Sequence, residues 1–333
     1  MPPLVSVVLP VYNEEDRIGA AVRSILDQSL PDLEVIVVDD GSTDATPTRL
    51  DSFDDPRLHV HRLMTNVGRA VAKNHALDQA TGRYVAFMDG DDEAEPTRLE
   101  TQVAFMEAHP EVDISGTALR TVGGPSSETW RPPTDHAHIR AELLFSCAVY
   151  GATAIVRRAF LERHALRFVP GHYVEDYELW GQALGSATFA NLPTVLLQHH
   201  FVPGDRAIDT QRKQQAMEPV IRAQLRTLGV EPTARQWTMH SALCRPAGTL
   251  LQSAADVRDC IRWVDTLLAQ NRRRHAIPPQ ALREVIDHHM VEALEAVPGH
   301  RRVLLRHLAR SPFARRRLLQ SLRVRARDLL SKE

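Results

Sequence analysis

The chain has little cysteine: three residues in 333, far apart at Cys147, Cys244 and Cys260. An odd number of scattered cysteines predicts neither a disulfide framework nor a zinc site, and is typical of thiols in a reducing compartment. No apolar run approaches the roughly 18 residues of a membrane-spanning helix. The N-terminal segment lacks the basic residues and the cleavage site of a signal peptide. We therefore expect a cytoplasmic protein.

Two glycine-rich phosphate-binding motifs are also missing. A dinucleotide dehydrogenase needs a glycine-rich turn after its first strand, whereas this chain has the bulky, acidic segment PVYNEED at residues 10–16. It has no G-x-x-x-x-G-K-[ST] loop either. A bound nucleotide would therefore be held by its base, its ribose and metal-bound phosphates.

The net charge of −2 hides an uneven distribution of charged residues. Residues 1–205 hold 16 basic and 30 acidic side chains, whereas residues 206–333 hold 24 basic and 12 acidic ones. Two such compositions in one chain indicate two structural units. We expect one domain over residues 1–205 and a helical, arginine-rich domain over residues 206–333.

The first domain alternates between two hydrophobic periods. Short β-branched runs predict strands at 5–11, 33–39, 58–63 and 83–89, and the segments between them predict helices at 14–28, 43–53, 68–80 and 96–109. Further strands are expected at 112–119, 129–131, 151–156 and 192–201, with helices at 136–146, 157–164 and 175–184. This alternation predicts an open, twisted α/β sheet, which binds its ligands beyond the carboxyl ends of its strands.

Acidic side chains follow two of these predicted strands. Asp39 and Asp40 end the strand at 33–39, and the sequence Asp89-Gly-Asp-Asp ends the strand at 83–89. Carboxylates grouped in this way repel one another unless a cation lies among them. Mg²⁺ or Mn²⁺, which prefer oxygen ligands, would suit such a site. The alternative is an ordinary solvated acidic turn.

Four motifs in this order resemble the inverting family 2 glycosyltransferases with the GT-A fold. They are SVVLPVYNEEDRI (6–18), VIVVDDGSTDAT (35–46), NVGRAVAKNHALDQATGRYVAFMDGDDEAEP (66–96) and VEDYELW (174–180). The resemblance covers roughly residues 4–200 and implies an open, twisted mixed sheet flanked by helices. It also implies sugar transfer from a nucleoside diphosphate sugar, most often a uridine diphosphate (UDP) sugar, with Mn²⁺ or Mg²⁺.

The resemblance also implies roles for individual residues. It assigns donor binding to Pro10, Tyr12, Asn13, Glu14, Asp39, Asp40, Asn66, Gly68, Lys73, Asn74, Asp89 and Gly90. It assigns metal binding to Asp91 and Asp92, with His199 or His200 on the closing strand as a further candidate. Lys73 stands where the family commonly has arginine.

Asp176 resembles the general base of the family, and Glu175 precedes it. A sugar hydroxyl is a poor nucleophile, and a carboxylate within hydrogen-bonding reach contributes about 10²–10⁴-fold to the rate. Glu175 and Trp180 would lie on the acceptor side, because the flat face of Trp180 suits a sugar ring. The alternative is that the two acids favour a helix N-terminus while Trp180 belongs to the core.

The C-terminal segment 312–330 places leucines along one face of a predicted helix and arginines around it. Such a helix could lie on an anionic membrane surface, which would suit a lipid-linked acceptor and a peripheral location on the inner face of the membrane. The alternative is a closing helix of the C-terminal domain. Nucleic-acid binding by these arginines is not favoured, because aromatic residues are not interleaved with them.

Rival functions fit these motifs less well. A catalytically inactive protein that binds nucleotide sugars or acts as a scaffold would not need Asp40, Asp91, Asp92 and Asp176 together. Nucleotidyl transfer would need a glycine-rich first turn. Aspartyl phosphatases and receiver domains also use acidic strand ends, but the downstream lysine context they need is missing. Glycosyl transfer is therefore the prediction, and inactive donor binding is its alternative.

Overall fold

The computed structural model describes residues 2–124, 127–200, 206–244 and 251–295. The chain divides into two compact units, the first made of residues 1–139 and 147–220 and the second of residues 140–146 and the chain from 221 onward. The division falls inside helix α8 (Arg206–Thr227). The domain ranges 1–205 and 206–333 therefore stay a prediction. The amphipathic helix predicted at 312–330 lies outside the described residues.

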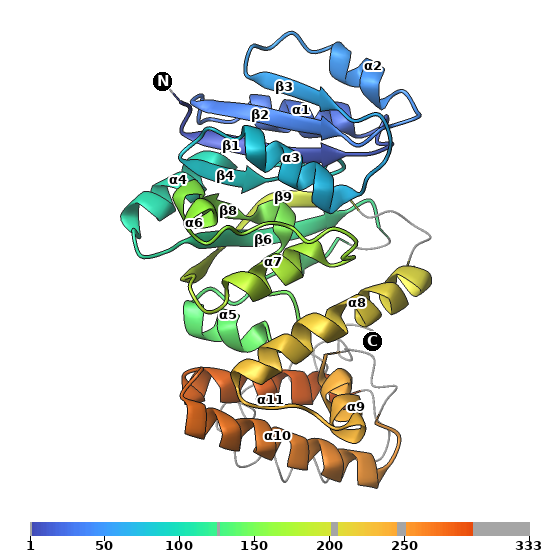
Figure 1. The fold of residues 1–333 in the computed structure, drawn as a ribbon, viewed down its shortest axis with the longest axis vertical. Coiled ribbons are helices and arrows are strands. Elements are labelled where there is room, and N and C mark those ends of the chain that lie inside the picture. Colours follow the sequence, from blue (N-terminus) through green and yellow to red (C-terminus); the bar gives the residue numbers. More distant parts are fainter. Residues whose placement is uncertain (1, 125–126, 201–205, 245–250, 296–333) are drawn as a thin grey trace, which may run out of the picture. The chain divides into compact units, whose positions relative to one another are not determined.

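The first unit is built on one mixed β-sheet (Figure 1). Four parallel strands lie side by side in the order β3 (Leu58–Arg62), β2 (Leu33–Asp39), β1 (Val5–Val11) and β4 (Tyr84–Phe87). The sheet continues through β8 (Ile155–Arg157), β6 (Ile114–Val122), β9 (Phe189–His200) and β5 (Glu93–Ala94), while β7 (Thr129–Trp130) pairs with β6. Strand β8 is antiparallel to both β4 and β6. The predicted open mixed sheet is confirmed.

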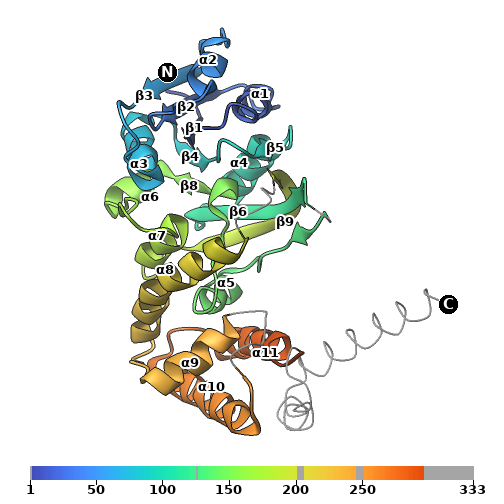
Figure 2. The same cartoon turned by 90° about the vertical axis from the view of Figure 1, so that its right-hand side faces the viewer.

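Helices cover both faces of this sheet (Figure 2). Helices α1 (Ile18–Leu26) and α4 (Arg98–Ala108) lie on one face, and α3 (Arg69–Gln79), α6 (Arg158–Arg163) and α7 (Glu175–Ala183) lie on the other. Helix α2 (Thr46–Asp51) connects β2 to β3. Because both faces are covered, we expect the central strands to be apolar at nearly every position.

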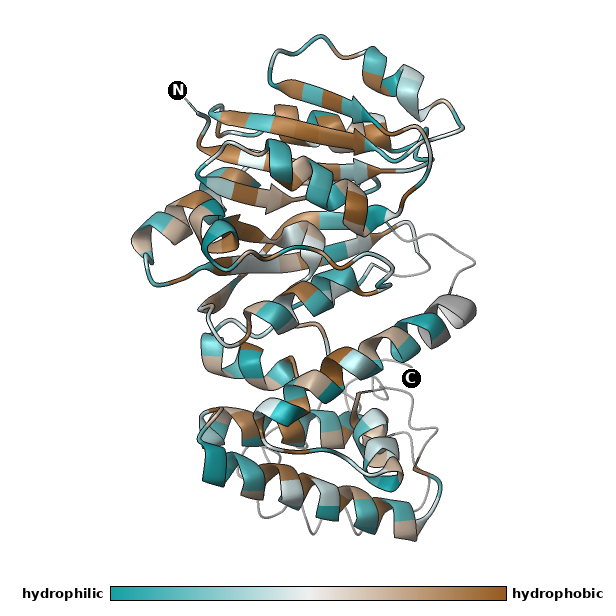
Figure 3. Cartoon of the chain, in the orientation of Figure 1, coloured by the Kyte–Doolittle hydropathy of each residue, from teal (hydrophilic) through white to brown (hydrophobic). Residues whose placement is uncertain are grey.

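The central strands meet this requirement. All seven residues of β1 are buried, and Figure 3 shows β1 and β2 as predominantly hydrophobic. Val5, Val7 and Leu9 share a core with Ile18 and Val22 of α1. Alternate residues of a strand point to opposite faces, so the remaining β1 side chains point to the other face of the sheet. The sheet is therefore a rigid platform whose strand ends position polar side chains.

Two helices begin later than the sequence pattern predicts. Helix α1 begins at Ile18 and α2 at Thr46. The residues before them form hydrogen bonds between the two turns, as in the bond from the Ala45 N–H to Glu15 Oε2 at 2.7 Å. Residues 151–153, predicted as part of a strand, form a 3₁₀ turn before β8. These local structures depend on contacts between distant segments.

The second unit is helical in the residues described. It contains α9 (Ala234–Leu243), α10 (Ala254–Arg274) and α11 (Pro279–Glu295), and α5 (His136–Glu142) leads into its segment 140–146. Buried His240 accepts a hydrogen bond from Trp263 Nε1 at 3.1 Å and faces the Leu144 carbonyl at 2.8 Å. Burial lowers the pKa of His240 to about 4, so the ring is neutral at pH 7. None of the helices in the described ranges combines the length and apolarity that a membrane crossing needs.

Candidate active site

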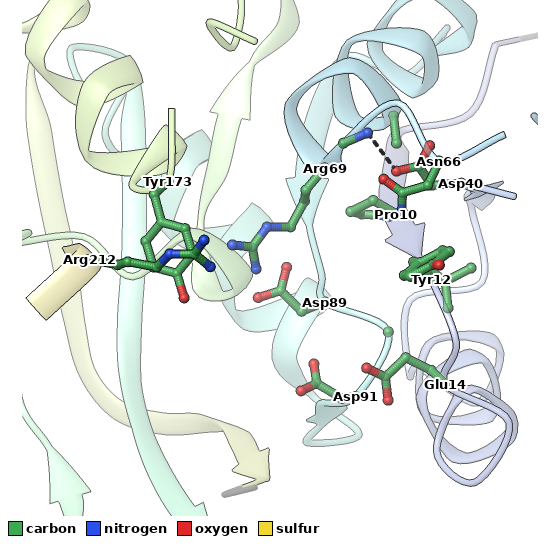
Figure 4. Close-up of a pocket in the computed structure, with 14 residues that line it drawn as sticks. Pro10, Tyr12, Glu14, Asp40, Asn66, Arg69, Asp89, Asp91, Tyr173 and Arg212 are labelled. Atoms are coloured by element: carbon green, nitrogen blue, oxygen red, sulfur yellow. Dashed lines mark hydrogen bonds between the residues drawn. The ribbon is translucent and has the colours of Figure 1, made fainter. Parts of the chain in front are cut away.

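The carboxyl ends of β1, β2 and β4 surround a cavity of about 660 Å³ in the first unit. This is where ligands bind in open α/β sheets, and the volume lies in the ordinary range for ligand pockets. The cavity is lined by Pro10, Val11, Tyr12, Glu14, Asp40, Asn66, Gly68, Arg69, Ala72, Asp89, Gly90, Asp91, Tyr173 and Arg212 (Figure 4). Nine of these were predicted from the sequence, from Pro10 in the first turn to Asp91 after β4.

Asp40 organises one wall of the cavity. Its two carboxylate oxygens accept hydrogen bonds from the backbone N–H groups of Val67 and Gly68, at 2.8 and 2.9 Å. These bonds hold the loop between β3 and α3 beside Pro10, where Gly68 adopts a φ of 95° that glycine tolerates best. The predicted donor-binding residues Pro10, Asp40 and Asn66 therefore lie together (Figure 4).

Asn13 and Asp39 support the first two turns and do not line the cavity. Asn13 has a φ of 55°, and its side-chain oxygen accepts a hydrogen bond from the Thr43 N–H at 2.8 Å. The carboxylate of Asp39 accepts one from the Ser42 N–H at 2.9 Å. The structure thus places these two predicted donor-binding residues behind the cavity wall.

The three carboxylates after β4 form one cluster. Single ligand atoms of Asp89, Asp91 and Asp92 all lie within 4.8 Å of one another. Burial, and then the charge of Asp89, raises the pKa of Asp91. Gly90 lets this turn lie against β1, because a Cβ at that position would be 3.1 Å from the Val11 side chain. Together these residues concentrate negative charge at the floor of the cavity.

Asp92 is completely buried and is held by the closing strand. Its Oδ1 lies 2.7 Å from Nδ1 of His199, which also lies 3.1 Å from the hydroxyl of Tyr150. Burial opposes the charged form of His199, but the hydrogen bond to Asp92 raises its pKa. Burial also raises the pKa of Asp92, to about 6. Its second oxygen, Oδ2, has no hydrogen-bond partner among the described residues.

A buried carboxylate oxygen without a partner is costly, and a cation beside it would remove that cost. The donor set of hard carboxylate oxygens is the one that Mg²⁺ and Mn²⁺ prefer. The residues after β4 therefore fit a divalent cation. Arg98 is fully buried near the same carboxylates. Burial lowers its pKa to about 10, and the charges of Asp92 and Asp89 act in the opposite direction.

Glu14 faces Asp91 across the cavity (Figure 4). Burial, and then the charge of Asp91, raises the pKa of Glu14 to about 7. Part of this carboxyl population is therefore protonated at neutral pH in the protein alone. A cation bound nearby would favour the ionised form of both groups.

A second charged cluster joins α3 to the start of α7. The ammonium group of Lys73 lies 2.7 Å from Oδ1 of Asp176 and 3.3 Å from Oε1 of Glu175. Arg69 also contacts Glu175, with its Nε 2.6 Å from the same oxygen. Burial disfavours the charged form of Lys73, but the surrounding carboxylates, above all Asp176, raise its pKa.

Asp176 has a quarter of its side chain exposed and does not line the main cavity. Burial raises the pKa of its carboxyl, and Lys73 acts in the opposite direction. The side chain packs tightly against Gly151, where an added Cβ would lie 1.8 Å from Oδ2 of Asp176. The orientation of this carboxylate is therefore fixed by Lys73 on one side and by Gly151 on the other.

Three predicted residues lie away from the cavity. Nε2 of His200 contacts Oε1 of Glu93 at 2.9 Å, and His200 is not part of the carboxylate cluster, so its role as a metal ligand stays a prediction. Asn74 exchanges two hydrogen bonds with the backbone of Phe168. Trp180 is fully buried and donates to the Val149 carbonyl at 2.9 Å. The predicted acceptor-side role of Trp180 is wrong, because no sugar can reach its ring.

Glu175, also predicted on the acceptor side, is 3% exposed and serves mainly as the partner of Arg69 and Lys73. Three residues that were not predicted, Arg69, Tyr173 and Arg212, line the cavity opposite Pro10 and Tyr12 (Figure 4). Arg69 follows Gly68 within a recognised motif, and Tyr173 precedes Asp176 by three residues. The position of both residues in or beside a motif could therefore have marked them as candidates. Arg212 comes from α8, beyond the motifs.

Comparison with known proteins gives the family. Residues 6–165 match the sequence model of "Glycosyl transferase family 2". A stretch of 188 residues is 32% identical to an Escherichia coli UDP-Glc:alpha-D-GlcNAc-diphosphoundecaprenol beta-1,3-glucosyltransferase, WfgD, and covers 53% of this chain and 68% of that protein. The chain belongs to glycosyltransferase family 2. The predicted resemblance is confirmed.

Other similarities extend this result. An uncharacterized glycosyltransferase of Haemophilus influenzae is 31% identical over 210 residues, which are 59% of this chain and slightly under two thirds, 65%, of that protein. A crystal structure of residues 1–349 of Staphylococcus aureus TarS, in complex with UDP-GlcNAc, superimposes with a TM-score of 0.59. At 22% identity it covers 91% of this chain and 90% of that one, and it confirms the GT-A fold.

Proposed function

We propose that this family 2 glycosyltransferase moves a sugar from a nucleoside diphosphate sugar to an acceptor hydroxyl, with inversion at the anomeric carbon and Asp176 as general base. The observation that supports this proposal best is that the site contains carboxylates in two different environments. The carboxylates of Asp89 and Asp91 line the cavity and form one cluster with buried Asp92, whereas Asp176 is paired with Lys73.

The main cavity suits the donor. Pro10, Tyr12, Asp40 and Asn66 form a wall on which a base and a ribose can lie, and Arg69 and Arg212 bring positive charge from the opposite side. Among the described residues Arg212 has no ion pair, so its charge is available to a phosphate. The names of the Escherichia coli relative and of the TarS complex described above both contain a UDP-sugar, which favours a UDP-sugar as donor.

Asp89, Asp91 and Asp92 would hold Mn²⁺ or Mg²⁺, with the orphaned Oδ2 of Asp92 as one reason for a cation there. A divalent cation at this position would neutralise negative charge on the departing nucleoside diphosphate. His199 fixes the orientation of Asp92 from behind. The role of His199 in this proposal is to position a carboxylate.

Asp176 would accept the proton of the acceptor hydroxyl. Lys73 favours the ionised form of this carboxylate against the effect of burial, and Gly151 and Lys73 hold its oxygens in one orientation. Attack by the hydroxyl on the face opposite the leaving diphosphate would invert the anomeric carbon. The WfgD name specifies a diphosphoundecaprenol-linked sugar as acceptor, and we propose a carbohydrate or lipid-linked hydroxyl acceptor for this chain.

Thermal-shift screening with UDP-Glc, UDP-GlcNAc and GDP-Man, each with and without Mn²⁺, tests donor binding. A ligand at 100 times its Kd stabilises the folded state by about 2.7 kcal/mol, so the true donor should raise the Tm most, and more with Mn²⁺. If no nucleotide or nucleotide sugar stabilises the protein, the proposed donor site is wrong.

Asp176→Asn then tests catalysis with the selected donor. We expect release of the nucleoside diphosphate to fall by about 10²–10⁴-fold, with the Kd of the donor changed less than twofold. Glu178→Gln is the matched control, because Glu178 lies on the same helix and bonds only to Gln182 in the contacts described. Normal turnover by Asp176→Asn would refute the general base. Donor binding without turnover by the unmodified protein would favour the inactive alternative.

A further inference from the structure

A smaller cavity of about 230 Å³ adjoins the main one. It lies between residues 67–70, at the start of α3, and the segment from Pro170 to Glu175 that precedes α7. Gly68, Arg69 and Tyr173 line both cavities. We call this space the side cavity. Neither the donor-binding residues nor the carboxylate cluster explains it.

Exposed apolar side chains gather around the two cavities. In the part of the chain that the structure describes, the exposed large hydrophobic residues are Tyr12, Met64, Val67 and Tyr173. Tyr12 lines the main cavity, Val67 lines the side cavity and Tyr173 lines both. Exposed apolar groups that cluster at a cavity mark a binding surface. Here a tyrosine ring and an aliphatic side chain lie beside the charged pair Arg69–Glu175.

This mixture of groups matches the surface of a sugar. A pyranose has apolar C–H faces that pack against an aromatic ring, and hydroxyls that bond to charged side chains. Tyr173, with 38% of its surface exposed, offers such a ring. At about 30 Å³ for each water, the side cavity holds roughly eight waters, which is room for one sugar ring but too little for a nucleotide.

The walls of the side cavity are held in place before any ligand binds. Asp40 fixes the backbone of Val67 and Gly68 by two hydrogen bonds. On the other side, Asn74 fixes the backbone of Phe168, at the start of the segment that leads to Tyr173. A preformed site loses less conformational entropy when a ligand binds.

The side cavity also lies next to the proposed base. Glu175 lines it, and the carboxylates of Glu175 and Asp176 share the ammonium group of Lys73. A ring in this cavity would therefore lie beside the residue that precedes Asp176, and Arg69 and Tyr173 line both this cavity and the donor cavity. We propose that the side cavity binds the terminal sugar ring of the acceptor and that Tyr173 is its stacking platform. This inference rests on the proposed function.

Saturation-transfer-difference NMR with four p-nitrophenyl glycosides, the glucoside, galactoside, mannoside and N-acetylglucosaminide, tests the proposal. Each is titrated with and without saturating UDP and Mn²⁺. We expect at least one glycoside to bind with UDP present. Tyr173→Ala should weaken it by about 2- to 10-fold, the range for one aromatic contact, and Tyr173→Phe should preserve it. Because Tyr173 also lines the donor cavity, the Kd for UDP is measured in both variants, and the loss of glycoside affinity in Tyr173→Ala should exceed any change in that Kd.

Met64→Ala is the matched control, because Met64 is 97% exposed and lines neither cavity; it should leave glycoside binding unchanged. The proposal is overturned if no glycoside binds, if Tyr173→Ala binds as tightly as the unmodified protein, or if UDP displaces the glycoside. Failure of UDP itself to bind with Mn²⁺ contradicts the proposed function instead. Glycoside binding without UDP then still decides whether the side cavity accepts a sugar.

Discussion

Replacing Lys73 by methionine removes a buried positive charge while keeping an unbranched apolar side chain. Lys73 is 1% exposed, and its ammonium group lies 2.7 Å from Asp176, whose side chain is 24% exposed. At that distance the attraction between two unit charges is about 6 kcal/mol at an effective dielectric constant of about 20. Most of this attraction is offset by the desolvation of both groups.

The net cost of Lys73→Met comes from the carboxylates it leaves without their partner. Removing one member of a buried ion pair costs about 3–5 kcal/mol. Since 1 kcal/mol shifts the Tm by about 2–4 °C in a domain of 150–250 residues, we expect a fall of about 6–20 °C. Differential scanning calorimetry measures it. Glu175 keeps Arg69 as a partner, so the loss should fall mainly on Asp176.

The same variant should change the pH dependence of turnover. Burial raises the pKa of Asp176, and Lys73 opposes that rise. A nearby opposite charge lowers the pKa of a carboxyl by about 1–3 units, so its removal should move the acidic limb of kcat/KM to higher pH by about that amount. Activity lost at pH 7 should then return in part at pH 8.5.

Lys73→Arg is the control, because it keeps the positive charge and should move the acidic limb much less. Lys73→Met combined with Asp176→Asn should be less destabilised than the sum of the single variants, because the uncompensated carboxylate is gone. The reasoning is refuted if Lys73→Met keeps both the Tm and the pH profile of the unmodified protein. It is equally refuted if the two substitutions are strictly additive.

Two further predictions concern the carboxylates. Gly151→Ala places a Cβ 1.8 Å from Oδ2 of Asp176, so turnover should fall by about 10²-fold because the base is misplaced. Isothermal titration should show unchanged donor binding. Unchanged turnover would contradict this prediction. Glu14 has a pKa raised from 4.5 to about 7, so its contribution to stability is complete below pH 4.5 and lost as the pH rises to 7. Glu14→Gln, compared with the unmodified protein in metal-free buffer, should therefore have a flatter decline of Tm over this window; equal declines would show that Glu14 does not titrate there.

Much of the fold follows from patterns within a few residues. The runs at 5–11 and 33–39 are apolar at nearly every position, so they predict covered strands with the bounds that the structure has. Helix starts are less predictable. Residues before Ile18 and Thr46 bond across to another turn, as Asn13 does to Thr43, and such contacts join segments about 30 residues apart.

The candidate site shows the same division. Asp40 and Asp91 line one cavity because they follow β2 and β4, the two parallel strands that flank β1 in the sheet. The pairing of Lys73 with Asp176 joins residues 103 apart through α3 and α7, and no periodicity reports it. A residue one turn after a polar helix start can point outward or inward, so the sequence did not fix the orientation of Trp180. In the structure its ring packs in the core against Phe87.

The two carboxylate groups differ in where their compensating charge comes from. Burial raises the pKa of Asp176, but the cation that opposes this rise, Lys73, belongs to the fold and acts without a ligand. Asp91 and Asp92 have raised pKa values because burial and mutual repulsion outweigh the lowering by His199. A divalent cation bound with the donor diphosphate would supply the missing positive charge. Donor binding and ionisation of this cluster should therefore be linked, whereas Asp176 keeps Lys73 as its partner in both states. Such a separation would let the donor side change charge state during a reaction cycle without altering the group that receives the acceptor proton.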